Sequence, residues 1–559
     1  MTRLRTLSFS AVALTVALLA GAASALHAQP SAAVALSGRV SSAAEGPMEG
    51  VLVTVRRAGA NFSTTVVSQA GGTYRFPASY VVPGTYALQI RASGYVLAGP
   101  KQVVVPATSG AHADVRLSPA TDLEDQLSNG EWLASVPGTA KQQTMLLDCT
   151  GCHTLQRIVD SYHTADDFLH NVLPRMQGYA NNSFWLEPQQ FPVARARVGY
   201  GFPPDLPAYL ASINQSTGPR TWPLKTLPRP SGASTHVIVT AYYLPDRLNQ
   251  PHDVIGTSDG SIWFSDFGQQ FLGQLNPKTA AVTMYPTPAI KPGYIAGALE
   301  LDADPSGYLW LADMFQGGIT RFDPKTKTFT PYPVPPAANP DMTQESMVMP
   351  LHDNVDGKVW TNNQDDRSWR RLDTKTGTWE SFGPYHYSDS PTHMFGAYGI
   401  LSDKNNGLWG LDFGGGAIGH LDPVTGAFKT IDTPTPNSRP RRGRIDDRTG
   451  LFWFAEFANN SVGVYDTVAD NGTIKEFPMP TPFDAPYDAV ADKTGSVWTA
   501  SMITDHVARL DPSTGHVVEY LMPFETNTRR VWVDNSTNPV TFWTGANHQA
   551  AILRVQPAP

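Results

Sequence analysis

Short runs of alternating apolar and polar residues recur from residue 31 onward and predict β-strands. Between residues 31 and 118 these runs are separated by Gly-Gly and Pro-Gly pairs, and they lie at 52–56, 64–68, 86–91 and 102–106. Strands at such spacing, with turn residues between them, are typical of a small β-sandwich. From residue 119 to about 215 the apolar positions change to helical spacing, which predicts a small all-α domain.

A tryptophan-centred repeat occupies residues 235–559. Its unit centres on a Gly-x-x-Trp pattern followed by an acidic or polar residue, with the tryptophans at Trp263, Trp310, Trp360, Trp409, Trp453, Trp498 and Trp543. The spacings are 47, 50, 49, 44, 45 and 45 residues. A period near 45 with four short strands per unit predicts a seven-bladed β-propeller. The last unit stops before its fourth strand, and we expect residues 236–244 (HVIVTAYYL) to supply it and close the ring.

The predicted fold class is therefore mainly β, with a sandwich and a small all-α domain preceding the propeller. Composition agrees, because 47 glycines and 47 prolines in 559 residues suit a turn-rich β protein and exclude a helical bundle. The net charge is −8, and no basic cluster follows residue 10, so nucleic acid is not an expected partner. Residues 216–234, rich in Pro, Ser, Thr and Gly, are predicted to be a linker, and with a second linker at about 119–130 they leave the relative placement of the domains open.

The first 28 residues have the pattern of a cleaved signal peptide. Arg3 and Arg5 precede an apolar stretch at 12–23, and small residues follow it. The apolar stretch is shorter than the roughly 18–20 residues that a membrane span needs. We therefore expect a periplasmic or secreted protein with no membrane span in the mature chain.

One strong chemical motif lies in the helical segment, at Cys149-Thr150-Gly151-Cys152-His153. C-x-x-C-H is the attachment signal for c-type haem. The two thiols can add to both vinyl groups of the haem, and the adjacent histidine then becomes the proximal ligand of the iron. These are the only cysteines in the chain, and covalent haem c is attached outside the cytoplasm, which fits the predicted export. The motif predicts electron transfer to a redox partner, either another cytochrome or a terminal acceptor.

The sixth ligand of the iron has several candidates. Met176, which follows a predicted helix at 165–172, is the first choice, and its alternative role is core packing. Met145 lies close before the motif, and His163 is the other rival. With predicted helices at 142–147 and 205–214, residues 119–215 resemble a small class I cytochrome c, although the 23-residue gap from His153 to Met176 is short for that family.

Two further resemblances concern the flanking domains. The stretches GGTYRF at 71–76, PGTY at 83–86 and ASGY at 92–95 resemble the carboxypeptidase regulatory-like domain, a resemblance that implies a spacer or adhesion module at 31–118. The stretch PHDV at 251–254, with DGSIWFSDF at 259–267, looks like a blade of the streptogramin B (virginiamycin B) lyase family, and the similarity extends over 235–559. That resemblance implies a propeller, and a β-elimination that uses a channel-mouth histidine base, nearby acids and magnesium.

Aligning the blades predicts a polar rim at one end of the propeller channel. The inner-strand candidates for binding or catalysis are His252, Arg442, Tyr487 and Arg529. The second-strand acids are Asp266, Asp313, Asp412 and Glu456, which could hold a divalent cation such as Mg²⁺ or Ca²⁺. Their alternative role is structural, as hydrogen-bond acceptors that cap the blade ends. The alignment places His252 beside Asp266, and Arg442 beside Glu456.

Three functions follow from these features. The first couples a small-molecule site on the propeller to a periplasmic electron acceptor through the haem, in the manner of a dehydrogenase. The second is electron transfer and binding without catalysis. The third, a streptogramin-type carbon–oxygen lyase, is less favoured, because elimination is redox-neutral and gives a fused haem no role.

Overall fold

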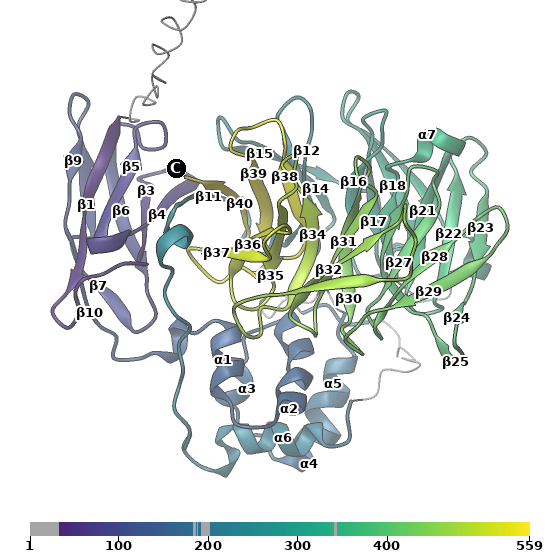
Figure 1. Cartoon of the computed structure of the whole chain (residues 1–559), viewed down its shortest axis with the longest axis horizontal. Helices are drawn as coiled ribbons and strands as arrows, with labels where there is room; N and C mark the ends of the chain where they lie inside the picture. Colours follow the sequence, from purple (N-terminus) through teal and green to yellow (C-terminus); the bar gives the residue numbers. More distant parts are fainter. Residues whose placement is uncertain are drawn as a thin grey trace, which may run out of the picture.

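The structure is a computed structural model that describes residues 33–180, 182, 186, 188–191, 202–339 and 344–558. The predicted signal peptide lies outside the described residues. A β-sandwich stands beside a propeller-like set of sheets, and a group of short helices lies under the propeller (Figure 1). The chain is mainly β, as the alternating pattern predicted.

The sandwich packs two sheets over one hydrophobic core that includes Leu36, Val53, Phe76 and Val115. One sheet contains β1 (Val34–Ser42), β2 (Gly46–Pro47), β5 (Thr73–Pro77), β7 (Tyr95–Gly99), β9 (Ala111–His112) and β10 (Val115–Pro119). The other contains β3 (Leu52–Arg57), β4 (Phe62–Val67), β6 (Gly84–Arg91) and β8 (Gln102–Val105). The four predicted strand runs correspond to β3, β4, β6 and β8.

The helical segment contains α1 (Asn129–Ser135), α2 (Ala140–Met145), α3 (Gln156–Val159), α4 (Ala165–Asp167), α5 (Leu173–Gln177) and α6 (Leu206–Ile213). Capping residues in the local sequence stabilise the N-termini of α1 and α2. Ser128 pairs with Glu131, and Thr139 pairs with Gln142, in reciprocal capping boxes. The predicted helix at 165–172 is present as α4 and a wider helical turn at 168–172, which continues into α5. Helices are also present at the predicted 142–147 and 205–214 sites, with slightly different ends.

The propeller region contains antiparallel sheets in which each strand pairs with the next in sequence. Six four-stranded sheets lie in the described ranges: β12 (Pro251–Gly256), β13 (Ile262–Asp266), β14 (Phe271–Asn276), β15 (Ala281–Pro286); β16 (Leu301–Ala303), β17 (Leu309–Asp313), β18 (Gly318–Asp323), β19 (Thr328–Pro333); β20 (Glu345–Met349), β21 (Lys358–Asn363), β22 (Ser368–Asp373), β23 (Trp379–Phe382); β26 (Ala397–Ser402), β27 (Leu408–Asp412), β28 (Ala417–Leu421), β29 (Phe428–Asp432); β30 (Pro440–Asp446), β31 (Leu451–Glu456), β32 (Ser461–Asp466), β33 (Ile474–Pro478); β34 (Pro486–Ala491), β35 (Val497–Ser501), β36 (His506–Asp511) and β37 (His516–Leu521). A short helix, α7 (Asp353–Asp356), and a hairpin of β24 (His386–Tyr387) and β25 (Ser390–Met394) interrupt them.

The repeat tryptophans lie on the second strand of their units, as predicted, and are buried. Several indoles donate to an aspartate six residues earlier, such as Trp310 to Asp304 and Trp498 to Asp492, each at 2.8 Å. Burying a tryptophan is favourable when its N–H finds an acceptor. The pair therefore explains why the repeat keeps an acidic turn before the tryptophan.

The final unit joins the propeller to the sandwich. Strands β38 (Val531–Asp534), β39 (Thr541–Ala546) and β40 (Ala551–Pro557) continue into β11 (Val237–Tyr243), which confirms the predicted closing strand. On its other edge β11 pairs with β4, from Ile238 opposite Val66 to Tyr242 opposite Phe62. The placement of the sandwich, which the sequence left open, is thus set by one eight-stranded sheet that spans both domains.

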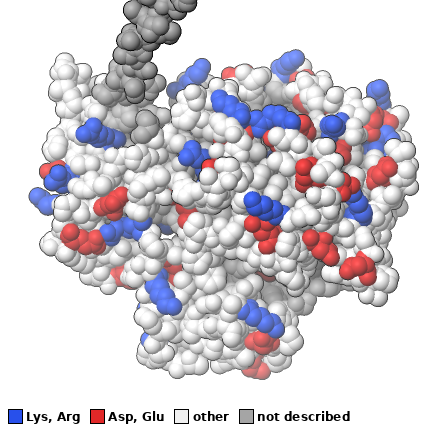
Figure 2. All heavy atoms as spheres, in the orientation of Figure 1, with Lys and Arg blue, Asp and Glu red and all other residues white. Residues whose placement is uncertain are grey.

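The surface in Figure 2 carries lysines and arginines interspersed with aspartates and glutamates, and most of that face is formed by other residue types. No helix in the described part of the chain is long and apolar enough to cross a membrane.

Candidate functional site

The four predicted rim residues lie close together on inner segments of the propeller, but the rim is not an open pocket. His252 is on β12, Arg442 on β30 and Tyr487 on β34, while Arg529 precedes β38. All four side chains are buried, with at most 4% of any residue exposed. The helical segment packs against two of them, because Tyr487 belongs to its hydrophobic cluster and Arg529 donates to the carbonyl of Gly151, which a blade alignment could not reveal.

His252 and Tyr487 form a hydrogen-bonded chain that ends on Asp253. The Nδ1 atom of His252 is 2.7 Å from Asp253 Oδ1, and its Nε2 is 3.2 Å from the Tyr487 hydroxyl. Burial lowers the pKa of His252 to about 3, so the imidazole is neutral at pH 7. Nδ1–H then donates to the carboxylate, and Nε2 accepts the proton of Tyr487. Tyr398 completes the chain with a short hydrogen bond to Tyr487.

Arginines surround the Tyr487 ring. The guanidinium carbon of Arg441 is 4.0 Å from the ring centroid, and that of Arg529 is 5.6 Å away. Burial opposes ionisation of Tyr487, but the charges of Arg441, Arg529 and Arg442 outweigh it and hold the pKa of Tyr487 below its usual value. The arginines therefore lower the cost of ionising Tyr487, whereas burial makes His252 a weak base for its proton.

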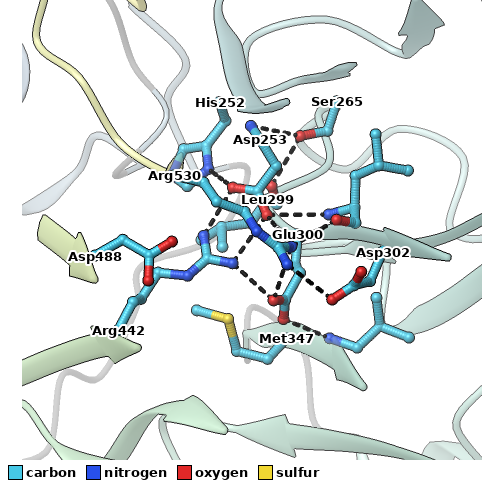
Figure 3. A network of polar contacts seen from close by, with 12 residues as sticks. His252, Asp253, Ser265, Leu299, Glu300, Asp302, Met347, Arg442, Asp488 and Arg530 are labelled. Atoms are coloured by element: carbon cyan, nitrogen blue, oxygen red, sulfur yellow. Dashed lines mark hydrogen bonds and ion pairs between the residues drawn. The ribbon is translucent and has the colours of Figure 1, made fainter. Parts of the chain in front are cut away.

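A buried ionic network lies under this chain (Figure 3). Arg442 donates to Asp253 at 2.7 and 2.9 Å, and Arg530 donates to the same carboxylate at 3.0 Å. Arg442 also contacts Glu300 at 2.7 Å, and Arg530 contacts Asp302 at 2.8 Å. Burial alone would raise the pKa of Asp253, but the two arginines hold it well below its usual range. Asp253 is thus a fixed anion that orients His252.

The second-strand acids do not converge. The carboxylate of Asp266 accepts hydrogen bonds from the backbone N–H groups of Gln250, Gly268 and Gln269, and burial raises its pKa to about 6. Asp313 accepts from Thr320, Asp412 from Tyr387, and Glu456 from Asn459. Each acid stabilises the end of its own unit, as the structural alternative expected. No group of three or more His, Cys, Asp or Glu with metal-holding geometry occurs in the described ranges, and the divalent cation stays a prediction.

The predicted pairing of rim residues across the hairpins is wrong by one or two positions. Asp266 lies opposite Pro251 rather than His252, and Glu456 lies opposite Pro440 rather than Arg442. In both hairpins the register shifts between the proline and the next paired residue. Such a bulge adds residues to one strand, so counting from the turn misplaces the partner.

The C-x-x-C-H segment contacts the propeller close to the hydrogen-bonded residues His252 and Tyr487. The backbone carbonyl of Thr150 accepts from Asn527 at 3.1 Å. The next carbonyl, of Gly151, lies 3.1 Å from Arg529 Nη2 and 3.3 Å from His548 Nε2. Asp148, just before the motif, forms an ion pair with Arg439 at 2.9 Å.

A shared hydrophobic cluster reinforces this docking. The helical segment contributes Trp132, Leu146 and Cys149, and the propeller contributes Tyr487 and Met502. Burial raises the pKa of the unmodified Cys149 thiol to about 12. Cys149 and Tyr487 therefore belong to one hydrophobic cluster that spans the two domains.

A cavity of about 480 Å³ lies between the two domains beside His153. It is lined by His153, Thr154, Gln156, Arg157, Asp160 and Leu186 from the helical segment and by Arg247, Glu525, His548 and Gln549 from the propeller. The Nδ1 atom of His153 lies 2.9 Å from the carbonyl of Thr154. This hydrogen bond assigns the ring proton to Nδ1 and leaves the Nε2 lone pair for a metal, as in most histidine ligands.

The candidate distal ligands from the sequence lie elsewhere. Met176 on α5 is a partly buried side chain packed against the hydrophobic cluster, and so is Met145. His163 forms an ion pair with Asp167 and leaves 44% of its side chain exposed. None of the three is among the described residues that line the cavity.

Sequence reasoning missed Asp253, Arg441, Asn527 and His548. Two of these residues could have been identified from the sequence. Asp253 directly follows His252, and Arg441 lies in the basic run PRRGR at 440–444. Asn527 and His548 could not, since their importance comes only from contact with a segment almost 400 residues earlier.

Comparison with known proteins agrees with the two flanking domains. Residues 386–558 match the Virginiamycin B lyase family, and residues 35–118 match the Carboxypeptidase regulatory-like domain. A streptogramin B lyase structure is 21% identical, covers 58% of this chain and 99% of its own, and has a TM-score of 0.48. Virginiamycin B lyase from Staphylococcus aureus is also 21% identical, covers 57% and 99%, and has a TM-score of 0.47.

None of the curated proteins compared is significantly similar to the chain. The two family matches leave residues 119–385 between them, which include the helical segment and the first part of the propeller region. Residues 35–118 are thus similar to the carboxypeptidase regulatory-like domain, and residues 386–558 are similar to the virginiamycin B lyase family.

Proposed function

We propose that the protein is an exported c-type haem protein that transfers electrons to a periplasmic redox partner. The observation that supports this best is the way in which the propeller binds the backbone of the Cys149–His153 segment. Propeller side chains bind the two carbonyls that lie between the cysteines. A motif whose spacing suits haem attachment is thereby held rigidly beside a cavity, which is what a fixed cofactor requires.

The residues present suit haem c. The proposed thioether ligands are Cys149 and Cys152, and His153 lines the cavity with Nε2 available as the proximal ligand. The cavity volume falls within the range of about 300–1,000 Å³ found for cofactor and ligand sites. Once bound, the haem would supply one-electron redox chemistry.

The Tyr487–His252 chain suits a role in proton balance. Tyr487 lies in the hydrophobic cluster that contains Cys149, and the neighbouring arginines hold its pKa below the usual value. Charge changes in an apolar site are costly unless a proton moves with them. We propose that this chain adjusts its protonation when the redox state beside it changes.

Burial of the rim favours electron transfer over catalysis at the channel mouth. His252 and Tyr487 are fully buried under the helical segment, so a substrate cannot reach them in this arrangement. The dehydrogenase-like coupling to a small molecule remains a prediction, with the interdomain cavity as its point of entry. Reduction of the haem by one compound of an anaerobic substrate panel would support it, and reduction by dithionite alone would count against it.

Lyase activity is the second candidate, and the match of residues 386–558 to the lyase family is the observation in its favour. The site disagrees, since its one channel-mouth histidine is buried and already bonded at both nitrogens. Incubation with a streptogramin B antibiotic, followed by mass spectrometry for ring opening, tests this candidate. We expect no linear product.

We also infer that the propeller closes as seven units and that residues 1–28 are removed on export. The period of the tryptophans and the pairing of β40 with β11 support the ring. Mass spectrometry of protein secreted from a bacterial host tests the cleavage.

The test of the proposed function is expression of the full chain with haem-maturation machinery. We expect a c-type absorption spectrum and a haem signal that survives denaturing electrophoresis. Replacing both thiols, Cys149→Ala with Cys152→Ala, should abolish that signal, whereas His163→Ala should preserve it. A wild-type protein that carries no covalent haem would refute the proposal.

A further inference from the structure

The cavity between the helical segment and the propeller has a polar lining in which positive and negative charges balance. Each domain contributes one guanidinium and one carboxylate to it. Arg157 and Asp160 come from the helical segment, and Arg247 and Glu525 come from the propeller. Leu186 is the only apolar residue among the described residues that line the cavity. A space of about 480 Å³ at a domain interface is a typical ligand site, and this lining suits a small polar ligand with charges of both signs.

The two arginines have guanidinium groups that the protein does not use. Within the described ranges, neither the Arg157 nor the Arg247 side chain forms a hydrogen bond or an ion pair. Glu525, by contrast, lies 3.8 Å from Nδ1 of His548. A guanidinium binds a carboxylate through short, charge-assisted hydrogen bonds. The two arginines are therefore suited to bind the carboxylate of a ligand.

Asp160 presents the opposite charge on the same wall. Its Oδ1 atom is buried and accepts no hydrogen bond in the described part of the chain. Burial, together with the charge of Glu124, raises the pKa of the Asp160 carboxyl. Asp160 follows Arg157 by three positions at the end of α3, so both lie on one side of that helix. A ligand ammonium group would supply the missing donor.

We infer that this cavity binds a small zwitterion, namely a free amino acid. The guanidinium groups of Arg157 and Arg247 bind its carboxylate, and the carboxylates of Asp160 and Glu525 bind its ammonium group. A ligand with only one of the two charges leaves one side of the lining without a partner, which lowers its affinity. The inference does not rest on the proposed haem function.

Ligand binding at this site has a consequence for the domain interface. Because the two walls belong to different domains, a bound amino acid bridges the helical segment and the propeller. A ligand that binds only the folded, assembled form stabilises that form by mass action. The thermal midpoint should therefore rise with the concentration of the amino acid.

The test measures binding of the common amino acids to the full-length protein, by thermal unfolding and then by isothermal titration calorimetry. We expect at least one amino acid to raise the thermal midpoint. Two analogues of that amino acid, its amide and its deaminated acid, should bind about tenfold more weakly or worse, because each lacks one charge. Equal binding of either analogue would overturn the inference.

Single substitutions locate the site. Arg157→Gln, Arg247→Gln and Asp160→Asn should each weaken binding about tenfold or more. Both arginines are exposed, so their replacement should leave folding intact, and Arg175→Gln, an exposed arginine on α5 outside the lining, is the matched control. Unchanged affinity in both cavity arginine variants, or a haem-loaded wild type that binds none of the amino acids, would overturn this inference alone. A wild type that binds an amino acid but carries no haem would refute only the proposed function.

Discussion

Asp253→Asn tests whether the buried network holds the centre of the propeller together. The carboxylate receives Arg442 Nη1 and Nη2 at 2.7 and 2.9 Å and Arg530 Nη1 at 3.0 Å, and it accepts from His252. Asparagine keeps the shape but removes the charge that balances two buried guanidinium groups. Breaking one side of a buried ion pair costs about 3–5 kcal/mol, and we expect a loss of free energy of unfolding of about that size.

Urea unfolding followed by tryptophan fluorescence measures this loss, because the repeat tryptophans report on the propeller. The matched control is Asp389→Asn, the same chemical change at an exposed position, which should stay within about 0.5 kcal/mol of wild type. Arg442→Leu combined with Asp253→Asn should cost less than the two single changes added together, since the residues are partners. A loss below about 1 kcal/mol for Asp253→Asn would refute the reasoning.

Three further predictions follow from single contacts. Burial raises the pKa of Glu456 to about 8 from 4.5, so stability should fall as pH rises through that window, and Glu456→Gln should flatten the fall in thermal midpoints. Trp498→Phe removes the indole bond to Asp492 and should cost about 1–3 kcal/mol in urea, whereas an unchanged midpoint would contradict it. Deleting residues 33–118 exposes an edge of β11 and should promote aggregation visible by light scattering, whereas a fully monomeric product would contradict it.

Much of the fold is predictable because its causes are local. Alternation sets the strands of the sandwich, the spacing of Trp263 and its equivalents sets the repeat, and capping residues such as Ser128 begin helices. The closing strand was also predictable, because an incomplete last unit needs a partner and residues 236–244 had no other one. For the strands, the repeat and the helix starts, the signal lies within about fifty residues of the structure it specifies, whereas the closing strand followed from the incomplete last unit.

The candidate site was only half predictable. His252, Arg442, Tyr487 and Arg529 converge as the repeat alignment expected, but the register against the second-strand acids failed at bulges. A bulge depends on how a strand fits its neighbours, which no periodicity records. The burial of Tyr487 and Arg529 also depends on their contacts with the helical segment, which a repeat alignment does not record.

The sequence by itself determined the elements, the repeat and the C-x-x-C-H motif, because hydrophobic periodicity and residue spacing act over short stretches of chain. Only the tertiary structure decided that the attachment segment seats on the propeller, that β4 joins β11, and that His548 shares a cavity with His153. These contacts join residues hundreds of positions apart. They form when folded domains pack against each other. Complementary surfaces, rather than local sequence patterns, then determine which segments are in contact.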